Sequence, residues 1–354
     1  MKTRHLAHIR ARICGIICLS SIVSAMTAGC IREDFAECKN TYDLQLVFDR
    51  NMLYADAFAS QVRSVDVKVF DSSTGREVYS FADSGTALAA ADYRVALPIP
   101  PGTYDILCWA GMAEGDSFGY ALPAADMLQQ HNVTLNTENG VSERRLDNLF
   151  HGLSRGVTFV SGNSLGHDQT QTATVYLTKN TNRVCVMLHN LDGTELDESG
   201  FTFSITSGNA LMNYDNTLDP AGRVTYRPWH VTPIMLESET NSENKSETKS
   251  EANSENVQAA LAAEISMARL VPDGNSRLDV YRTADGERII SVPLERNLLL
   301  YKGEYHSMMS DQEYLDRQDD YTITFILDRN NNWDRAAMIY INNWATPPVQ
   351  YQDW

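Results

Sequence analysis

The chain is 354 residues long, which predicts about two domains of ordinary size. Hydrophobic residues make up 43% of it and charged residues 21%, a balance typical of globular proteins that argues against wholesale disorder. The formal net charge is −17, and an acidic surface repels phosphate backbones, so we expect no nucleic-acid partner.

The first 29 residues have the features of a secretory signal peptide. A basic start without acidic residues precedes a mostly apolar stretch, residues 13–26, which is too short to span a bilayer. The following sequence Thr27-Ala28-Gly29-Cys30 resembles the lipobox of bacterial lipoproteins, in which the cysteine is acylated. We therefore expect residues 1–29 to be removed and Cys30 to be anchored in outer-membrane lipid. The alternative is an ordinary thiol behind a plain secretory cleavage site.

Residues 30–41 are expected to be a lipidated tether. Within them, Glu33 and Asp34 resemble the acidic export signal of surface lipoproteins in the Bacteroidetes. The predicted location is therefore the cell outer membrane, with the body of the protein exposed at the surface.

Most of the remaining chain alternates apolar and polar residues with the period of two that is typical of strands. Such runs occur in both halves, at residues 44–48, 65–69, 104–108, 173–177, 184–188, 201–205, 278–280, 321–327 and 337–341. This distribution predicts an all-β fold of two tandem β-sandwiches. We place the N-terminal one in residues 42–178 and the C-terminal one in residues 179–354, with the boundary at a polar break, residues 178–182.

Helical pattern is limited to two short segments, residues 121–130 and 311–317. Residues 238–256 form a different kind of segment, in which Ser-Glu-x-x units repeat with almost no apolar side chains. Such a composition cannot bury enough surface to offset the cost of ordering, so we expect a disordered loop over residues 237–257 of the C-terminal sandwich. A charged spacer or a variable surface antigen is the functional alternative.

The remaining cysteines and histidines give no sign of a catalytic or metal site. Cys14 and Cys18 leave with the signal, and Cys38, Cys108 and Cys185 allow at most one disulfide among themselves. The alternative for Cys108 and Cys185 is a pair of buried, unpaired thiols. His151 and His189 are isolated, and none of the common hydrolase, phosphate-binding or dinucleotide-binding motifs is present, so we expect no enzyme, no catalytic residue and no cofactor.

The best candidate for a metal site is the sequence from Asp328 to Asp334, with oxygen-bearing side chains at alternating positions. Trp333 replaces the glycine that a calcium loop needs, and no bidentate glutamate follows. A β-turn explains the sequence equally well, so we expect no metal.

Several segments together resemble the FimB/Mfa2 family of fimbrial anchor proteins. These are the mature start at residues 30–35, then residues 51–58, 65–71, 97–104, 109–111, 149–152 and 180–184, and the closing Ile339-Tyr340-Ile341-Asn342-Asn343-Trp344. The resemblance implies an outer-membrane lipoprotein with two transthyretin-like β-sandwiches that anchors a type V fimbria. It implies a fimbrial stalk or accessory subunit as the partner.

Type V fimbriae are thought to polymerise by strand donation, in which an extended segment completes a neighbour's sheet through main-chain hydrogen bonds. The candidate segment here is the C-terminal run, residues 336–342 with the tail to residue 354, and the candidate partner-binding residues are Ile339, Ile341 and Trp344. The alternative is that this run is an internal last strand of the second sandwich.

A surface glycan-binding lipoprotein is the second function class, because exposed aromatic rings can stack on sugars. The candidate rings are Tyr54, Trp109, Tyr120, Trp229, Trp333 and Trp344. Aromatic residues of sandwiches more often fill the core. A surface hydrolase, the third class, requires a pocket with convergent polar groups that the sequence does not indicate.

Overall fold

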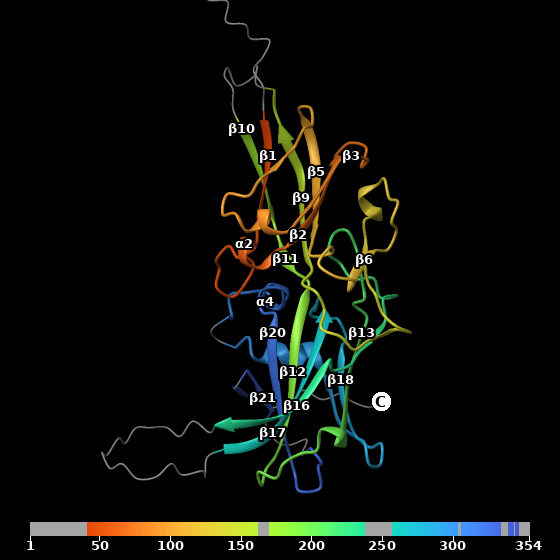
Figure 1. Cartoon of the computed structure of the whole chain (residues 1–354), viewed down its shortest axis with the longest axis vertical. Coiled ribbons are helices and arrows are strands. Elements are labelled where there is room, and N and C mark those ends of the chain that lie inside the picture. Colours follow the sequence, from red (N-terminus) through yellow and green to blue (C-terminus); the bar gives the residue numbers. More distant parts are fainter. Residues whose placement is uncertain are drawn as a thin grey trace, which may run out of the picture. The chain divides into compact units, whose positions relative to one another are not determined.

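The computed structural model describes residues 41–161, 170–237, 257–303, 306–333, 339–342 and 344–346. Within these residues the strands form five hydrogen-bonded sheets (Figure 1). Two pairs of sheets enclose apolar cores, so the predicted all-β fold of two β-sandwiches is confirmed. None of the helices in the described part of the chain is long and apolar enough to cross a membrane.

The N-terminal sandwich packs a sheet of strand order β10-β1-β4 against one of order β11-β9-β5-β2-β3. Alternate side chains of β1, β2 and β5 point into the core between these sheets, as their period of two predicts. The strands are β1 Thr41–Val47, β2 Ser64–Asp71, β3 Glu77–Ser84, β4 Val95–Ala96, β5 Gly102–Ala110, β9 Phe150–Phe159, β10 Thr170–Tyr176 and β11 Thr178–Lys179.

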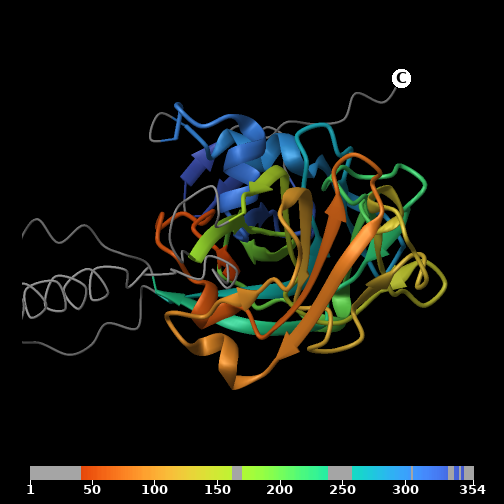
Figure 2. The same cartoon turned by 90° about the horizontal axis from the view of Figure 1, so that it is seen from above.

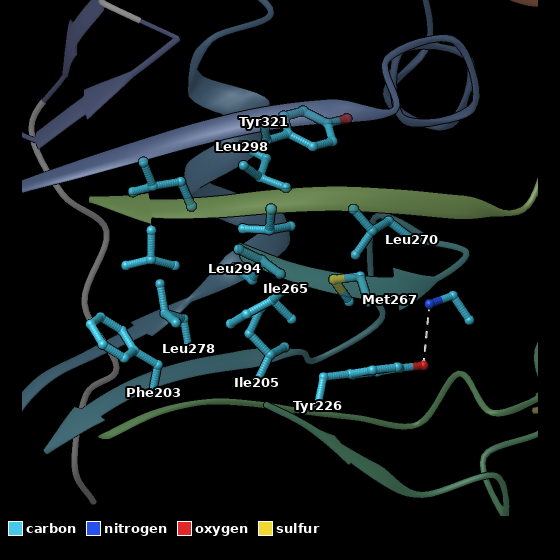
Figure 3. Packing of buried hydrophobic residues seen from close by; sticks show 14 of the residues in the cluster. Phe203, Ile205, Tyr226, Ile265, Met267, Leu270, Leu278, Leu294, Leu298 and Tyr321 are labelled. Carbon is cyan, nitrogen blue, oxygen red and sulfur yellow. Dashed lines mark hydrogen bonds between the residues drawn. The ribbon is translucent and has the colours of Figure 1, made fainter. Parts of the chain in front are cut away.

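The C-terminal sandwich packs a sheet of order β16-β17-β12-β20-β21-β22 against one of order β19-β18-β13-β15-β8. Figure 3 shows its core, where Phe203, Ile205 and Leu278 of one sheet meet Ile265 and Met267 of the other. The strands are β8 Val141–Ser142, β12 Thr181–Asn190, β13 Phe201–Ser207, β15 Val224–Tyr226, β16 His230–Glu237, β17 Val257–Ala268, β18 Arg277–Arg282, β19 Arg288–Pro293, β20 Asp320–Leu327, β21 Ile339–Ile341 and β22 Trp344–Thr346.

The two halves of the chain exchange short strands. A small sheet of order β14-β7-β6 combines β6 Phe118–Tyr120 and β7 Val133–Leu135 with β14 Leu211–Met212, which comes from the C-terminal half. Conversely, β8 lies between β7 and β9 in sequence but pairs with β15 of the C-terminal sandwich. The segment that carries β6 and β7, yellow in Figures 1 and 2, lies beside the orange strands β2 and β3.

One buried apolar cluster includes residues of both halves of the chain, and the N-terminal core forms a second cluster. Phe70, Leu107 and Trp109 point away from the N-terminal core, and they belong to the same buried cluster as the C-terminal core. Strand β5 is therefore buried on both faces, with Ile106 and Cys108 on one side and Leu107 and Trp109 on the other.

Helices are few and short. The helix predicted over residues 311–317 is present as α4 Asp311–Arg317, capped by the Ser310 side chain, which accepts the Glu313 backbone N–H at 3.0 Å. The others are α2 Phe58–Gln61, α3 Leu294–Leu300 and the 3₁₀ turns η2 Thr86–Ala89, η3 Leu128–Gln130 and η5 Glu198–Gly200.

The prediction of a helix over residues 121–130 is wrong, except that the last three residues form the 3₁₀ turn η3. This segment bonds to the strand region beside it: Glu77 N–H donates to the Asp126 carbonyl at 2.9 Å, and Leu128 N–H to the Gly75 carbonyl at 3.1 Å. Pairing with a neighbouring strand thus satisfies backbone groups that a helix would have satisfied within itself.

Two glycines in the segments that resemble the fimbrial anchor family lie where another part of the chain comes so close that a side chain would not fit. A Cβ on Gly152 of β9 would lie 2.5 Å from Val175 Cγ1, where β9 meets β10 and closes the N-terminal sandwich. Gly111 has a φ of +94°, and a Cβ there would lie 1.8 Å from the Asn148 carbonyl oxygen. A side chain at either position would force the chain apart.

One carboxyl group is buried beside helix α3. Glu295 is 3% exposed, and its two oxygens accept the Ser276 backbone N–H at 3.2 and 3.0 Å. Because burial disfavours the charged form, the pKa of Glu295 is raised from 4.5 to about 7. Its folded-state pKa therefore lies above its unfolded value, so its contribution to stability is complete below about pH 4.5 and is lost as the pH rises through 7.

We predict that Glu295→Gln removes this part of the pH dependence, because an amide cannot ionise. Relative to the variant, the unmodified protein should lose on the order of 3 kcal/mol of unfolding free energy between pH 4.5 and 8. Urea unfolding of both proteins across that pH range measures the difference. If the unfolding free energies of the two proteins changed with pH in the same way, the raised pKa of Glu295 would be contradicted.

Candidate functional site

The C-terminal candidates for partner binding lie at one edge of the six-stranded sheet. Strand β21 pairs with β20 through Ile323–Ile341 and Thr324–Tyr340, and β22 then pairs with the outer side of β21. Ile339 and Ile341 are fully buried in the C-terminal core, which is the arrangement of an internal strand. Trp344 begins β22, where its backbone pairs opposite Ile341.

The predicted lipid site and export signal, Cys30, Glu33 and Asp34, lie outside the described residues, as do Cys38 and the Ser-Glu repeat. The residues that flank the repeat are described. Strands β16 and β17 pair from His230–Glu264 to Glu237–Val257, so the repeat is inserted between two hairpin strands of the C-terminal sheet.

The two described cysteines are free and buried. Cys108 lies inside the N-terminal core, where burial raises the pKa of its thiol far above the usual range. Burial raises the pKa of Cys185, on β12, to about 12. Both thiols are therefore un-ionised and unreactive at neutral pH.

Two of the aromatic residues proposed as a glycan platform lie in the interior and cannot stack on a sugar at the surface. Trp109 and Trp333 are buried, Trp109 donating its indole N–H to the His131 carbonyl at 3.0 Å. Trp229 is partly exposed, but Arg145 lies 5.9 Å from its ring and His230 stacks at 5.6 Å. The side chain of Trp344 lies outside the described residues.

The segment from Asp328 to Asn332 forms a turn stabilised by its own aspartate. Asp328 Oδ1 accepts the backbone N–H groups of Asn330 and Asn332 at 2.8 and 2.9 Å. Among the described residues there is no cluster of three or more His, Cys, Asp or Glu side chains suited to a metal ion.

The polar break at residues 178–182 is buried where the chain passes from the first sandwich to the second. Asn180 is fully buried and donates to Asn216 Oδ1 at 2.6 Å, while Asn216 donates back at 3.3 Å. Asn182 donates to the Ala268 carbonyl at 3.3 Å, and Asn209 donates to the same oxygen at 3.1 Å. This segment is polar because it fixes loops of the C-terminal half, and not because it is a solvated linker.

A buried ion pair continues this network. The Arg269 side chain donates through Nε and Nη2 to Asp316 of α4 at 2.8–3.0 Å, and through Nη1 to the Asn216 carbonyl. Gln312, one turn earlier in α4, donates to the same aspartate at 2.8 Å. A buried charge needs a partner of this kind, because removing one member of the pair typically costs about 3–5 kcal/mol.

The residue after Asp316 in α4 forms hydrogen bonds directly to the N-terminal half of the chain. Arg317 Nη1 donates to the carbonyls of Asp49 and Asn51 at 3.0 and 3.2 Å, and its guanidinium lies 4.3 Å from the Tyr54 ring centre. Tyr54 has a φ of +52°, an uncommon conformation for a residue with a side chain. Loop 49–54 is thus held against a helix 268 residues away in sequence.

His151 lies at the base of the same junction. Its Nε2 is 2.8 Å from the Tyr214 carbonyl oxygen, which can only accept, so Nε2 carries the proton. Trp109 packs edge-on against the ring at 4.7 Å. Burial lowers the pKa of His151 to about 4, so it is neutral at physiological pH.

Some of these groups line a cleft of about 660 Å³ between the two sandwiches. Its floor holds His151, Asn216 and Arg269, and two further arginines, Arg50 and Arg155, line it from the N-terminal half. The sequence reasoning missed this cleft. The one available signal was Arg269, a charged residue between the apolar stretches that end at Ala268 and begin at Leu270.

A comparison with protein-family models matches residues 35–347 to the fimbrillin-A associated anchor proteins Mfa1 and Mfa2. No curated protein sequence matches the chain. Among solved structures, a candidate adhesin from Bacteroides thetaiotaomicron is 30% identical, with a TM-score of 0.74 over 86% of this chain and 97% of the other.

Two further structures are similar. A candidate polysaccharide-binding protein from Bacteroides thetaiotaomicron is 26% identical, with a TM-score of 0.71 over 88% of this chain and 99% of the other. The fimbrial anchor protein Mfa2 from Porphyromonas gingivalis shares the fold, at 16% identity and a TM-score of 0.63 over 88% of this chain and 99% of the other. The family match covers most of the sequence and agrees with the resemblance of its motifs; the chain therefore belongs to the family of fimbrillin-A associated anchor proteins.

Proposed function

We propose that this chain is a non-catalytic lipoprotein that holds a type V fimbria on the outer membrane, tethered by an acylated Cys30 and coupled to a fimbrial subunit by strand donation. The observation that carries the proposal is the family match over residues 35–347, which begins just after the lipobox-like sequence ending at Cys30. A fimbrial anchor acts at the cell surface, and an acylated cysteine supplies the attachment that such a role requires.

The lipid end of the proposal has a simple physical basis. Each buried methylene of an acyl chain contributes about 0.8 kcal/mol, so several chains on one cysteine make a stable attachment to the membrane. Glu33 and Asp34 lie three and four residues after Cys30 and would direct the lipoprotein outward. The short segment before Thr41 would then connect the lipid to the first strand.

The described part of the chain is suited to carry a load from that tether. Strand β1 lies in the middle of its sheet, paired in parallel with β10 over seven residues from Thr41 to Val47 and with β4 on its other side. A pull along β1 must therefore break many hydrogen bonds together. The shared core and the Arg269–Asp316 pair then connect the N-terminal sandwich to the C-terminal sheet.

The segment that we propose is donated to a fimbrial subunit is the hairpin β21–β22. It is the outermost element of the six-stranded sheet, and its apolar residues Ile339 and Ile341 alternate as a donated strand's side chains must. The proposal is that this segment leaves its own sheet and completes that of a fimbrial subunit, with Trp344 following in the same extended segment.

We predict that Cys30→Ala in the native cell releases both this protein and its filaments into the medium, because the lipid is the tether. Cys38→Ala is the matched control and should leave both on the cell. Immunodetection in the cell and medium fractions measures the outcome. Filaments that stay on the cell while the protein is released would contradict an anchoring role.

We predict that a disulfide between β20 and β21 blocks filament attachment, because it prevents the C-terminal strand from leaving its sheet. Thr324→Cys with Tyr340→Cys places the two thiols directly opposite each other in an antiparallel pair. A Cys185→Ser background removes the thiol of the neighbouring strand β12. Oxidised cells should shed their filaments, and a reductant applied during assembly should restore attachment.

The control for this experiment is a disulfide elsewhere in the same sheet. Thr232→Cys with Ala262→Cys joins β16 to β17, far from the C-terminal edge in strand order, and should not affect attachment. Normal attachment in the oxidised β20–β21 variant would show that the strand is not donated.

A further inference from the structure

We propose that the cleft between the two sandwiches is a binding site for an acidic saccharide, one that carries a carboxylate on a sugar ring. This is a separate activity from anchoring, because it uses neither Cys30 nor the C-terminal hairpin. The cleft, of about 660 Å³, falls within the range of small-molecule sites and lies at a junction of two folded layers, where such sites are common.

Two arginines give the cleft its preference for an anion. Arg50, just after β1, donates through Nη1 to Thr178 Oγ1 at 3.0 Å, and Arg155 of β9 donates through Nη2 to the Tyr214 hydroxyl at 3.2 Å. Within the described residues neither guanidinium makes an ion pair within 4 Å, so each keeps several N–H donors for a ligand. Guanidinium groups bind carboxylates in two-pronged geometry.

The acidic groups of the cleft are already engaged. Asp316 is bound by Arg269, and Asp215 accepts the Thr217 backbone N–H at 3.2 Å and its hydroxyl at 2.7 Å. His151 is neutral, so the three arginines and two aspartates of the lining, Arg50, Arg155, Arg269, Asp215 and Asp316, leave a net charge of +1. Because the chain as a whole has a net charge of −17, a local excess of positive charge attracts an anion specifically to the cleft.

The other walls favour a sugar as the carrier of the carboxylate. Tyr176 is 47% exposed at the rim, which leaves ring surface for the apolar face of a pyranose. Ser154, Thr217 and Gln312 supply hydroxyl and amide groups within the same lining, suited to sugar hydroxyls. The floor is held by the Asn216 and Arg269 hydrogen bonds, so the site is formed before a ligand arrives.

The test uses the full-length chain purified in mild detergent and digalacturonic acid as the probe, with titration calorimetry as the measurement. We expect saturable binding and at least about tenfold weaker binding of the neutral disaccharide galactobiose, which lacks the carboxylates. Arg50→Gln and Arg155→Gln should each weaken digalacturonate binding about tenfold, the loss of one charge-assisted hydrogen-bonding group.

Arg94→Gln is the matched control. Arg94 is also exposed, donates to the Tyr93 carbonyl at 2.8 Å and lies outside the cleft lining, so its replacement should leave the affinity unchanged. Unfolding temperatures of all variants confirm that they are folded. Absence of saturable binding at millimolar digalacturonate, or an equal loss in all three variants, would overturn the proposal.

A further titration with an acidic tripeptide distinguishes a carboxylate carried by a sugar from one carried by a peptide. Binding as tight as that of digalacturonate would assign the cleft to a peptide and overturn the saccharide proposal. The outcome is independent of anchoring, because the Arg50→Gln and Arg155→Gln variants should retain filaments on the cell whether or not the cleft binds a sugar.

Discussion

The structure depends on a buried polar network at the point where the chain passes from one sandwich to the other. Asn180 and Asn216 satisfy each other there, and Arg269 joins the Asn216 carbonyl to Asp316 of α4. Buried amides and charges are costly unless every partner is in place, so this network permits one relative placement of the surrounding loops and penalises others. An apolar junction would tolerate sliding more readily.

The packing around the network also joins the two sandwiches. The outer face of β5 is buried under a sheet to which the C-terminal half contributes β14, and the N-terminal half contributes β8 to the opposite sandwich. Arg317 adds a contact from α4 to the loop after β1. The two sandwiches are therefore joined by packing as well as by hydrogen bonds, which suits the proposed role of transmitting a pull from a tether to a filament.

Local features of the fold could be predicted from the sequence, whereas contacts between distant segments could not. Alternation identified the strands, and the short helical pattern over residues 311–317 identified α4. The segment at residues 121–130 was misread because its backbone partners, Gly75 and Glu77, are about 50 residues away. Periodicity carries no information about which distant strand an element will meet.

The same limit applies to the candidate sites. The polarity of residues 178–182 indicated a boundary, but a buried asparagine and a solvated one look alike in sequence, so the network that Asn180 makes was not foreseen. Ile339 and Ile341 fit both a core strand and a donated strand, since both require alternating apolar side chains. Arg50 and Arg155 lie more than 100 residues apart, and the fold alone brings them to one cleft.

The claim that the two sandwiches form one cooperative body is tested most directly by differential scanning calorimetry of the mature chain without its lipid. The account predicts a single transition in which the calorimetric and van't Hoff enthalpies agree. Two resolved transitions, each with the enthalpy of about half the chain, would show that the sandwiches unfold independently and would contradict it.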